Sequence, residues 1–490
     1  QAIAEEPSWR LLWLRELADQ MTYAGFAEKA VPLYEEYLDS GTASPEDALR
    51  ARLGLALALS WTDQLEQSLK EYEALLADDP GNRDAQLGRA RVLSWRDRQG
   101  PSREAYVEVL AQDPLNAEAR RSLGRVQSWR GRQRDAQRQL SEFVAENPDD
   151  NEGVFLLAQS QDWMGRPDKA KKTLERHLQN SPDDTRSREL LKDIEFRERP
   201  ATRVDYQESH QSDQLTIHGI SAEQNVFLND GRTVVGPRYQ FYRFNQKKTD
   251  VDHINVNRPG LYARHRISDS LQWAGAAFID LIDVEGARKD REIFTYDTSL
   301  TYWPNDLLRF DVGSSRTTFD NLTSLRRGIA ANFANFSVDV TPDELTRITG
   351  RYNWGDFTDG NVRNWGQAEI ERRIWNHPAL FVGYQYTGFD FRREFNNGYY
   401  NPDTYNSNEL IMRTTGLLGE RFTYQFDGGY GAEQATPGGQ QSIWRAGTSL
   451  NYSIFDRLTI GGRYNYFSSA TASSGGFERG TTGVNVQFVW

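Results

Sequence analysis

Charged side chains recur at alternate positions through the second half of the 490-residue sequence. Arg309 and Asp311, for example, stand between the apolar residues Leu308, Phe310 and Val312. Guanidinium and carboxylate groups form strong, directional hydrogen bonds with each other, and both bind hydroxyl groups. The pattern selects Arg264, Arg266, Asp280, Asp297, Arg309, Asp311, Arg347, Arg351, Glu369, Glu371, Arg373, Asp427, Arg445 and Arg463.

Patterns that indicate catalysis or metal binding do not accompany these residues. The six histidines lack metal-ligand spacing, and the sequence contains neither a phosphate-binding loop nor a nucleophile elbow. The absence of cysteine excludes disulfides, thiol catalysis and thiolate metal sites. We therefore expect no enzyme, cofactor or metal, with chemistry by carboxylates such as Asp427 as the alternative. A net charge of -12 argues against a nucleic-acid partner.

The first 200 residues contain a 34-residue repeat, marked by Pro80, Pro114, Pro148 and Pro182 and by Trp61, Trp95, Trp129 and Trp163. This is the period of the tetratricopeptide repeat (TPR), a pair of antiparallel helices. Proline ends the second helix of each unit, and we expect each tryptophan to pack where the first helix turns into the second. The sequence therefore predicts a TPR domain over residues 1–196, with four to five repeats and a concave groove that binds proteins.

After a charged linker at 197–201, apolar and polar residues alternate with period two over segments of about ten residues. This alternation is typical of strands with one apolar and one polar face. Sixteen strands are predicted, near 202–211, 214–228, 232–245, 250–267, 271–282, 293–303, 307–318, 325–340, 344–355, 361–375, 379–391, 405–418, 421–433, 440–454, 457–468 and 477–490.

The connections between strands distinguish a membrane barrel from a soluble sandwich. Every second connection is tight, at 229–231, 268–270, 304–306, 341–343, 376–378, 419–420 and 455–456. Those between them are mostly longer, such as 284–292, 394–405, 434–440 and 469–476. Short turns alternating with long loops are typical of outer-membrane barrels. The sequence thus predicts a multidomain chain, an all-α TPR superhelix followed by a 16-stranded antiparallel transmembrane β-barrel at 202–490.

A barrel of sixteen strands encloses a water-filled lumen. Because a charge that faces lipid near mid-membrane costs about 2–4 kcal/mol, we expect the charged residues selected above to line the pore. Two roles stay open for them, mutual pairing that stiffens the wall or a polar track for a hydroxyl-rich or charged polymer. With an even number of strands, the first and the last residue of the barrel sequence lie at the same side of the membrane, which is the periplasmic side. The chain ends in an amphipathic strand with Phe488 and Trp490, which resembles the signal read by the barrel-assembly machinery.

A TPR array joined to a C-terminal barrel of sixteen strands resembles the exopolysaccharide exporters of Gram-negative bacteria. These include the Pel exporter, the poly-N-acetylglucosamine porin and the cellulose exporter. The arginine-rich composition and the abrupt start at Gln1 favour the Pel type, and we expect the chain to be the C-terminal part of a longer exporter.

The resemblance implies export of an exopolysaccharide chain through a barrel in outer-membrane lipid, as part of biofilm matrix secretion. It further implies a periplasmic N-terminal domain whose groove recruits a polysaccharide-modifying enzyme, an outer-membrane lipoprotein or both, and loops that gate the pore. Three alternatives remain. A general or uptake porin needs only the barrel, a receptor uses outer loops such as 394–405, and a scaffold combines the repeats with a plugged barrel.

Overall fold

The computed structural model describes residues 7–41, 43–246, 253–284 and 290–490. The chain forms two compact units, one reaching to Met164 and including Lys172–Arg188, the other comprising Gly165–Lys171 and Glu189–Trp490. A helical TPR-like array is followed by a closed antiparallel barrel of sixteen strands, which confirms the predicted fold class. No helix in the described part of the chain has the length and apolar character needed to cross a membrane.

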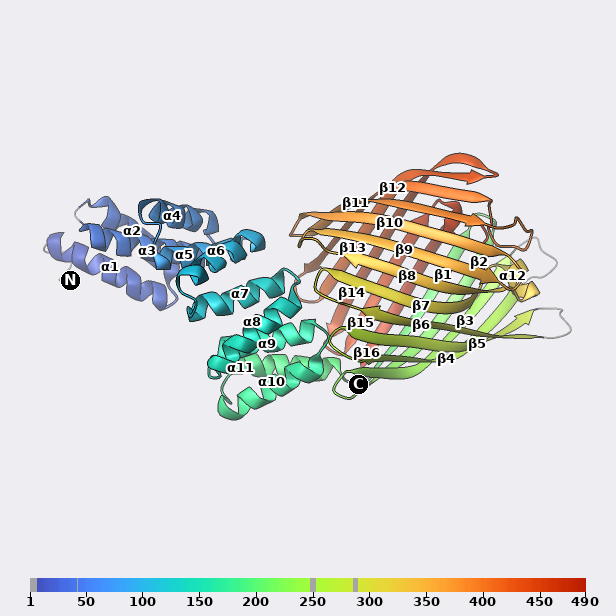
Figure 1. Ribbon diagram of the computed structural model, residues 1–490, viewed down its shortest axis with the longest axis horizontal. Helices are drawn as coiled ribbons and strands as arrows, with labels where there is room; N and C mark the ends of the chain where they lie inside the picture. The colour runs from blue at the N-terminus through green and yellow to red at the C-terminus, as the bar shows by residue number, and fades with distance from the viewer. Residues whose placement is uncertain (1–6, 42, 247–252, 285–289) are drawn as a thin grey trace. The chain divides into compact units, whose positions relative to one another are not determined.

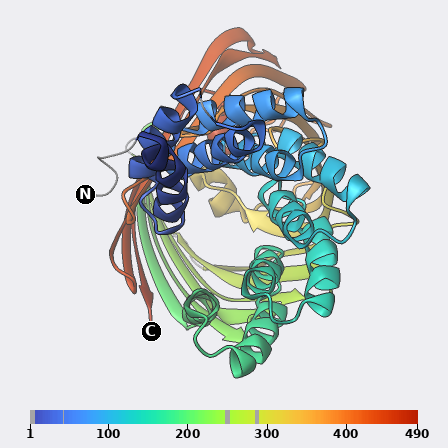
Figure 2. The ribbon, with the colours of Figure 1, turned by 90° about the vertical axis from the view of Figure 1, so that its left-hand side faces the viewer.

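The helices of the array stack pairwise along the chain (Figures 1 and 2). Each proline of the 34-residue repeat lies two residues beyond the end of a second helix, because proline cannot continue the helical hydrogen-bond ladder. The helices are α1 (Pro7–Tyr23), α2 (Ala27–Asp39), α3 (Pro45–Trp61), α4 (Leu65–Asp78), α5 (Arg83–Trp95), α6 (Gln99–Gln112), α7 (Ala117–Trp129), α8 (Gln133–Glu146), α9 (Asn151–Trp163), α10 (Pro167–Asn180) and α11 (Thr185–Arg197).

Small residues allow the two helices of a repeat to approach closely. A Cβ added at Gly124 would lie 2.5 Å from Cγ of Leu140 on the next helix. Ser102 forms a similar close contact in the preceding repeat, where its hydroxyl donates to the Ala90 carbonyl at 2.7 Å. The tryptophans are less buried than a purely packing role predicts. Each is the last residue of a first helix, and between 37% and 48% of its surface stays exposed.

The barrel closes through its first and last strands, which pair from Ala201 with Val489 to Gln211 with Arg479. Both ends of the barrel sequence therefore lie at one end of the barrel. The strands are β1 (Ala201–Gln211), β2 (Leu215–Leu228), β3 (Thr233–Gln246), β4 (His253–Arg266), β5 (Leu271–Val284), β6 (Arg291–Tyr302), β7 (Leu308–Thr318), β8 (Ala330–Val340), β9 (Thr346–Phe357), β10 (Val362–Trp375), β11 (Ala379–Phe391), β12 (Thr404–Leu418), β13 (Phe422–Thr436), β14 (Gly439–Phe455), β15 (Leu458–Phe467) and β16 (Arg479–Val489).

The two ends of the barrel differ in their connections. The end that holds Ala201 and Val489, the turn end, carries the predicted tight turns. At the opposite end, the loop end, the described residues include three long segments, at 319–329, 392–403 and 468–478. The predicted loop at 434–440 is wrong, because β13 and β14 extend to a turn at 437–438. The predicted strand at 325–340 starts only at Ala330, because 322–327 form helix α12 (Leu322–Arg327). The loop predicted at 284–292 lies mostly outside the described residues.

Candidate functional site: the interior of the barrel

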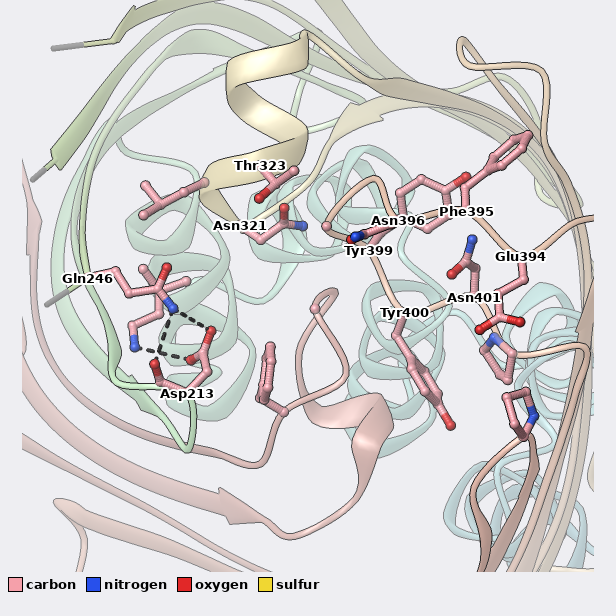
Figure 3. Close-up of a pocket in the computed structure, with 17 residues that line it drawn as sticks. Asp213, Gln246, Asn321, Thr323, Glu394, Phe395, Asn396, Tyr399, Tyr400 and Asn401 are labelled. Carbon is pink, nitrogen blue, oxygen red and sulfur yellow. Dashed lines mark hydrogen bonds between the residues drawn. The ribbon is translucent and has the colours of Figure 1, made fainter. Parts of the chain in front are cut away.

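The barrel wall has two chemically different faces. Alternate residues of a strand point to opposite faces of the sheet. One face exposes large apolar side chains, including Leu261 and Leu410, which are 68% and 67% exposed. Exposed apolar surface of this extent marks contact with a membrane or a protein. The other face lines the lumen. Helix α12 lies inside the lumen and packs against this inner face (Figure 3).

Strand pairing places every charged residue of the predicted set on the inner face, at positions in register with inward neighbours. They come from nine strands: Arg264 and Arg266 from β4, Asp280 from β5, Asp297 from β6, Arg309 and Asp311 from β7, Arg347 and Arg351 from β9, Glu369, Glu371 and Arg373 from β10, Asp427 from β13, Arg445 from β14 and Arg463 from β15.

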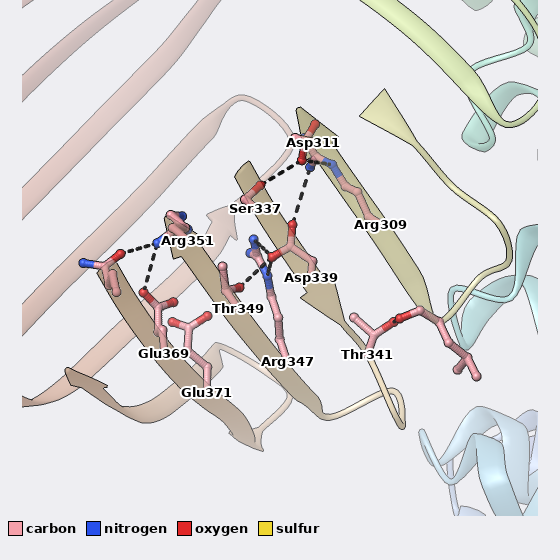
Figure 4. Close-up of polar contacts among 12 residues, drawn as sticks. Arg309, Asp311, Ser337, Asp339, Thr341, Arg347, Thr349, Arg351, Glu369 and Glu371 are labelled. Carbon is pink, nitrogen blue, oxygen red and sulfur yellow. Dashed lines mark hydrogen bonds and ion pairs between the residues drawn. The ribbon is translucent and has the colours of Figure 1, made fainter. Parts of the chain in front are cut away.

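A ladder of ion pairs runs across β7, β8 and β9 (Figure 4). Arg309 Nε lies 3.0 Å from Asp311 on its own strand, and Arg347 Nη2 lies 3.0 Å from Asp339 on the adjacent strand. The Thr349 hydroxyl donates to the same Asp339 carboxylate at 2.6 Å. One strand further, Arg351 Nη1 lies 3.7 Å from Glu369. These contacts tie neighbouring strands together, and they neutralise most of the charge that each side chain presents to the lumen.

A second group of pairs uses partners that the sequence analysis did not select. Arg258 holds the fully buried Asp280 through two hydrogen bonds of 2.7 Å. Asp205, Asp339, Glu409 and Arg413 are the other missed members. Their side chains pair respectively with Arg463, Arg347, Arg445 and Glu371. All occupy the inward positions of their strands, so extending the alternation through every strand would have found them.

A few inward charges stay outside this network. Arg264, Asp297, Arg373 and Asp427 form no ion pair within the described residues. Arg266, by contrast, has several contacts: its guanidinium packs over the Trp303 ring at 4.3 Å and donates to the Asp269 carbonyl at 2.8 Å. The inner wall is therefore largely self-neutralised, with isolated charges between the pairs.

Helix α12 covers an apolar strip inside the barrel. Leu322 and Leu325 are 4% and 1% exposed, although they belong to a loop. They pack on inward-facing residues of β2 to β5, namely Leu215, Ile217, Phe244, Ile254, Val256, Ile282 and Val284. The inward face, predicted as the polar face of each strand, is therefore apolar in this strip near the loop end. The strip is apolar because it forms the docking surface of α12.

The three long loops are held to one another mainly by polar contacts. Asn321 Nδ2 donates to the Ser474 hydroxyl at 3.1 Å, and the Ser324 hydroxyl donates to the Asn397 carbonyl at 2.8 Å. The Tyr400 amide donates to the Ser474 carbonyl at 2.7 Å. These bonds join all three loops into one assembly across the loop end of the lumen, and none of them was predictable from the sequence.

Two tyrosines anchor the 392–403 loop at the wall. Tyr399 stacks among inward aromatic rings, with its centroid 5.0 Å from that of Phe357, and its hydroxyl donates to Asp359 at 2.8 Å. Burial raises the pKa of Tyr399. Burial, with a smaller contribution from the charge of Glu433, raises the pKa of Tyr400 to about 12. Both phenols therefore remain neutral hydrogen-bond donors at physiological pH.

A cavity of about 390 Å³ remains between the loops (Figure 3). Its lining combines amides and carboxylates with aromatic rings, including Asp213, Asn321, Glu394, Tyr400 and Asn401. Such a lining suits a hydrated, hydroxyl-rich ligand better than an apolar one. Among the described residues, no group of three or more histidine, aspartate or glutamate side chains could hold a metal ion.

Comparison with known proteins agrees with the helical repeat. Residues 131–194 match the tetratricopeptide repeat family model. No curated protein matches the sequence.

Solved structures that are similar to this chain share little sequence identity with it. A structure titled "Bacterial polysaccharide outer membrane secretin" is 16% identical, with 60% of this chain and 99% of that chain covered and a TM-score of 0.47. A thermophilic TPR protein of Thermus thermophilus is 18% identical, with 37% and 97% covered and a TM-score of 0.33. A tetratricopeptide repeat protein of Parabacteroides merdae is 16% identical, with 38% and 72% covered and a TM-score of 0.33.

Proposed function

We propose that this chain conducts an exopolysaccharide across the bacterial outer membrane through the lumen of its barrel. The observation that carries the proposal is the two-sided wall, with exposed apolar side chains outside and paired charges inside. The apolar face contacts outer-membrane lipid, and the turn end faces the periplasm together with the helical array. A barrel of sixteen strands leaves room for an extended polymer.

The pairing of the inward charges suits a conduit. An isolated charge would hold a polar ligand strongly, whereas a charge already neutralised by its neighbour, such as Arg347 beside Asp339, offers weaker hydrogen bonds. Conduction requires contacts that are favourable enough for entry and weak enough for release. A hydroxyl-rich chain exchanges such bonds one at a time as it moves. Polymer synthesis and inner-membrane transport then drive the chain, and the barrel supplies a hydrated path.

The helical array and the last strand complete the proposal. The concave groove of the array recruits a periplasmic polysaccharide-modifying enzyme, an outer-membrane lipoprotein or both. The barrel-assembly machinery reads Phe488 and Trp490. Trp490 also lies at the barrel seam, where its indole N–H donates to the Thr202 hydroxyl at 2.9 Å. The Pel polysaccharide is the first candidate cargo.

Deleting residues 1–200 separates export from simple diffusion. Under the export proposal, the truncated barrel still conducts small ions but no longer supports polysaccharide secretion, since the recruiting array is lost. Under the porin alternative, the truncated barrel still supports small-solute uptake and growth on small solutes. Polysaccharide secretion is then the same with or without the chain. Secretion that is normal in the truncated strain would contradict the proposal.

The loop assembly favours a second candidate, a receptor or scaffold with a plugged barrel. Planar-bilayer recording distinguishes the two. If the loops are movable, shortening 392–403 and 468–478 raises the conductance. If the lumen is closed by the wall itself, current stays at the baseline and the receptor function is preferred.

A further inference from the structure

The four repeat tryptophans form a row of half-exposed rings. Trp61, Trp95, Trp129 and Trp163 end α3, α5, α7 and α9, and they are 46%, 37%, 42% and 48% exposed. These helices contact one another in that order. Because packed helix axes lie roughly 8–10 Å apart, equivalent rings recur at about that interval along one edge of the array.

The core of the array does not need these rings. Its buried cluster is formed by other side chains of the array, such as Leu69, Tyr72, Leu93 and Tyr106. A large aromatic ring left half in water at one repeat position is unremarkable. The same exposure of an equivalent tryptophan at four successive repeats indicates that the four rings together form one binding surface.

The rings are isolated from one another, unlike the centre of a protein interface. None of the four contacts another of the four in the described part of the chain. Polar residues follow three of the four rings in the turn, for example Thr62 and Asp63 after Trp61, whereas Met164 follows Trp163. Protein interfaces instead gather apolar and aromatic residues into a continuous, dehydrated core.

All four rings precede the same kind of turn, and neighbouring side chains hold two of them, Trp61 and Trp129, in place. The second residue after each tryptophan adopts a left-handed conformation, with φ of 60°, 56°, 76° and 75° at Asp63, Asp97, Gly131 and Gly165. Tyr23 packs edge-on against Trp61 with centroids 6.1 Å apart. The Arg125 guanidinium lies over the Trp129 ring at 5.4 Å. A ring oriented in this way loses little side-chain entropy when it binds a ligand.

We propose that this row binds an extended β-1,4-linked polysaccharide, one ring to each disaccharide. In such a ribbon every second sugar presents the same face, and that repeat matches the interval between neighbouring helices. The C–H face of a pyranose stacks on an indole, and the polar turn residues bind its hydroxyls. The proposal rests on the export function, and it assigns to the array a guiding contact with the polymer in addition to partner recruitment.

Binding of defined oligosaccharides to the full chain in detergent tests the row. Cellohexaose and chitohexaose serve as probes in isothermal titration calorimetry. We expect Trp95→Ala and Trp129→Ala each to weaken binding roughly 2- to 10-fold, the loss of one aromatic contact, and the double variant to multiply the two losses. Phenylalanine at both positions should retain most of the affinity. Leu115→Ala, which removes a 77% exposed side chain elsewhere in the array, is the matched control and should change nothing.

Failure of this inference is distinguishable from failure of the export function. The inference is overturned if neither hexasaccharide binds, or if both alanine variants bind as the parent does while circular dichroism shows that they fold. Export is tested separately, by secretion and conductance. If secretion depends on the chain but the tryptophans bind no oligosaccharide, the export proposal stands and only the proposed binding by the tryptophan row is refuted.

Discussion

Releasing α12 from the inner wall should open the barrel. Leu322 and Leu325 are the side chains that bury its apolar face. Leucine to alanine removes roughly three carbon groups, each worth about 0.8 kcal/mol when buried, so the pair contributes about 5 kcal/mol to docking. A loss of that size shifts the docking equilibrium by about 10³- to 10⁴-fold. We therefore expect Leu322→Ala/Leu325→Ala to convert a mostly docked helix into a mostly released one.

Planar-bilayer recording of the purified chain measures this shift. The double variant should show larger unitary conductance or a higher open fraction than the parent. Leu300→Ala, on the lipid-facing side of β6, is a suitable control because its side chain is 45% exposed on the outer face. Identical currents in the parent and the double variant, with hydrogen exchange showing α12 unprotected, would refute the reasoning that α12 narrows the passage.

The inward charges and one helix cap lead to three further predictions. Asp280→Asn should destabilise the barrel by about 3–5 kcal/mol in urea unfolding from vesicles, because it leaves Arg258 unpaired in a buried site, whereas Asp297→Asn should be nearly silent. The double variant Arg264→Gln/Arg373→Gln removes two inward cations that have no ion-pair partner among the described residues. In a barrel whose long loops have been shortened, the reversal potential should therefore shift towards cation selectivity. An unchanged reversal potential would contradict the placement of these two arginines in the lumen. Burial raises the pKa of Asp184, but hydrogen bonds from Ser187 and His177 outweigh it and lower that pKa below its usual range. The resulting stabilisation is present above the unfolded pKa and is lost as pH falls through the folded one. Asp184→Ala should therefore cost about 1 kcal/mol at pH 7, and thermal unfolding should show the difference shrinking as the pH falls towards about 3.

The repeat and the strands were predictable because their signals are local and periodic. A helix ends two residues before Pro80 and before each of its equivalents in the other repeats. The alternation around Arg309 and Asp311 can be recognised without reference to distant residues. The inward direction of the charged residues also follows from this alternation, once a lipid-facing charge is recognised as unfavourable.

The loop assembly was not predictable, because its structure depends on residues far apart in the sequence. Helix α12 has only six residues and two leucines, too few for a periodic signal. It forms where Leu322 and Leu325 meet inward apolar residues such as Ile254 and Ile282, which a strictly polar lumen would not contain. The exposure of Trp95 and its equivalents is likewise a property of the stacked array, and the spacing alone indicated only packing.

The most direct test of the export proposal is the sugar content of two compartments in a strain that lacks this chain. Polysaccharide is measured in the extracellular matrix and in the periplasm, beside the parent and a complemented strain. The proposal predicts that the matrix polymer falls to background, that the same polymer or its fragments accumulate in the periplasm, and that complementation restores secretion. Normal amounts of matrix polymer in the deletion strain would contradict it.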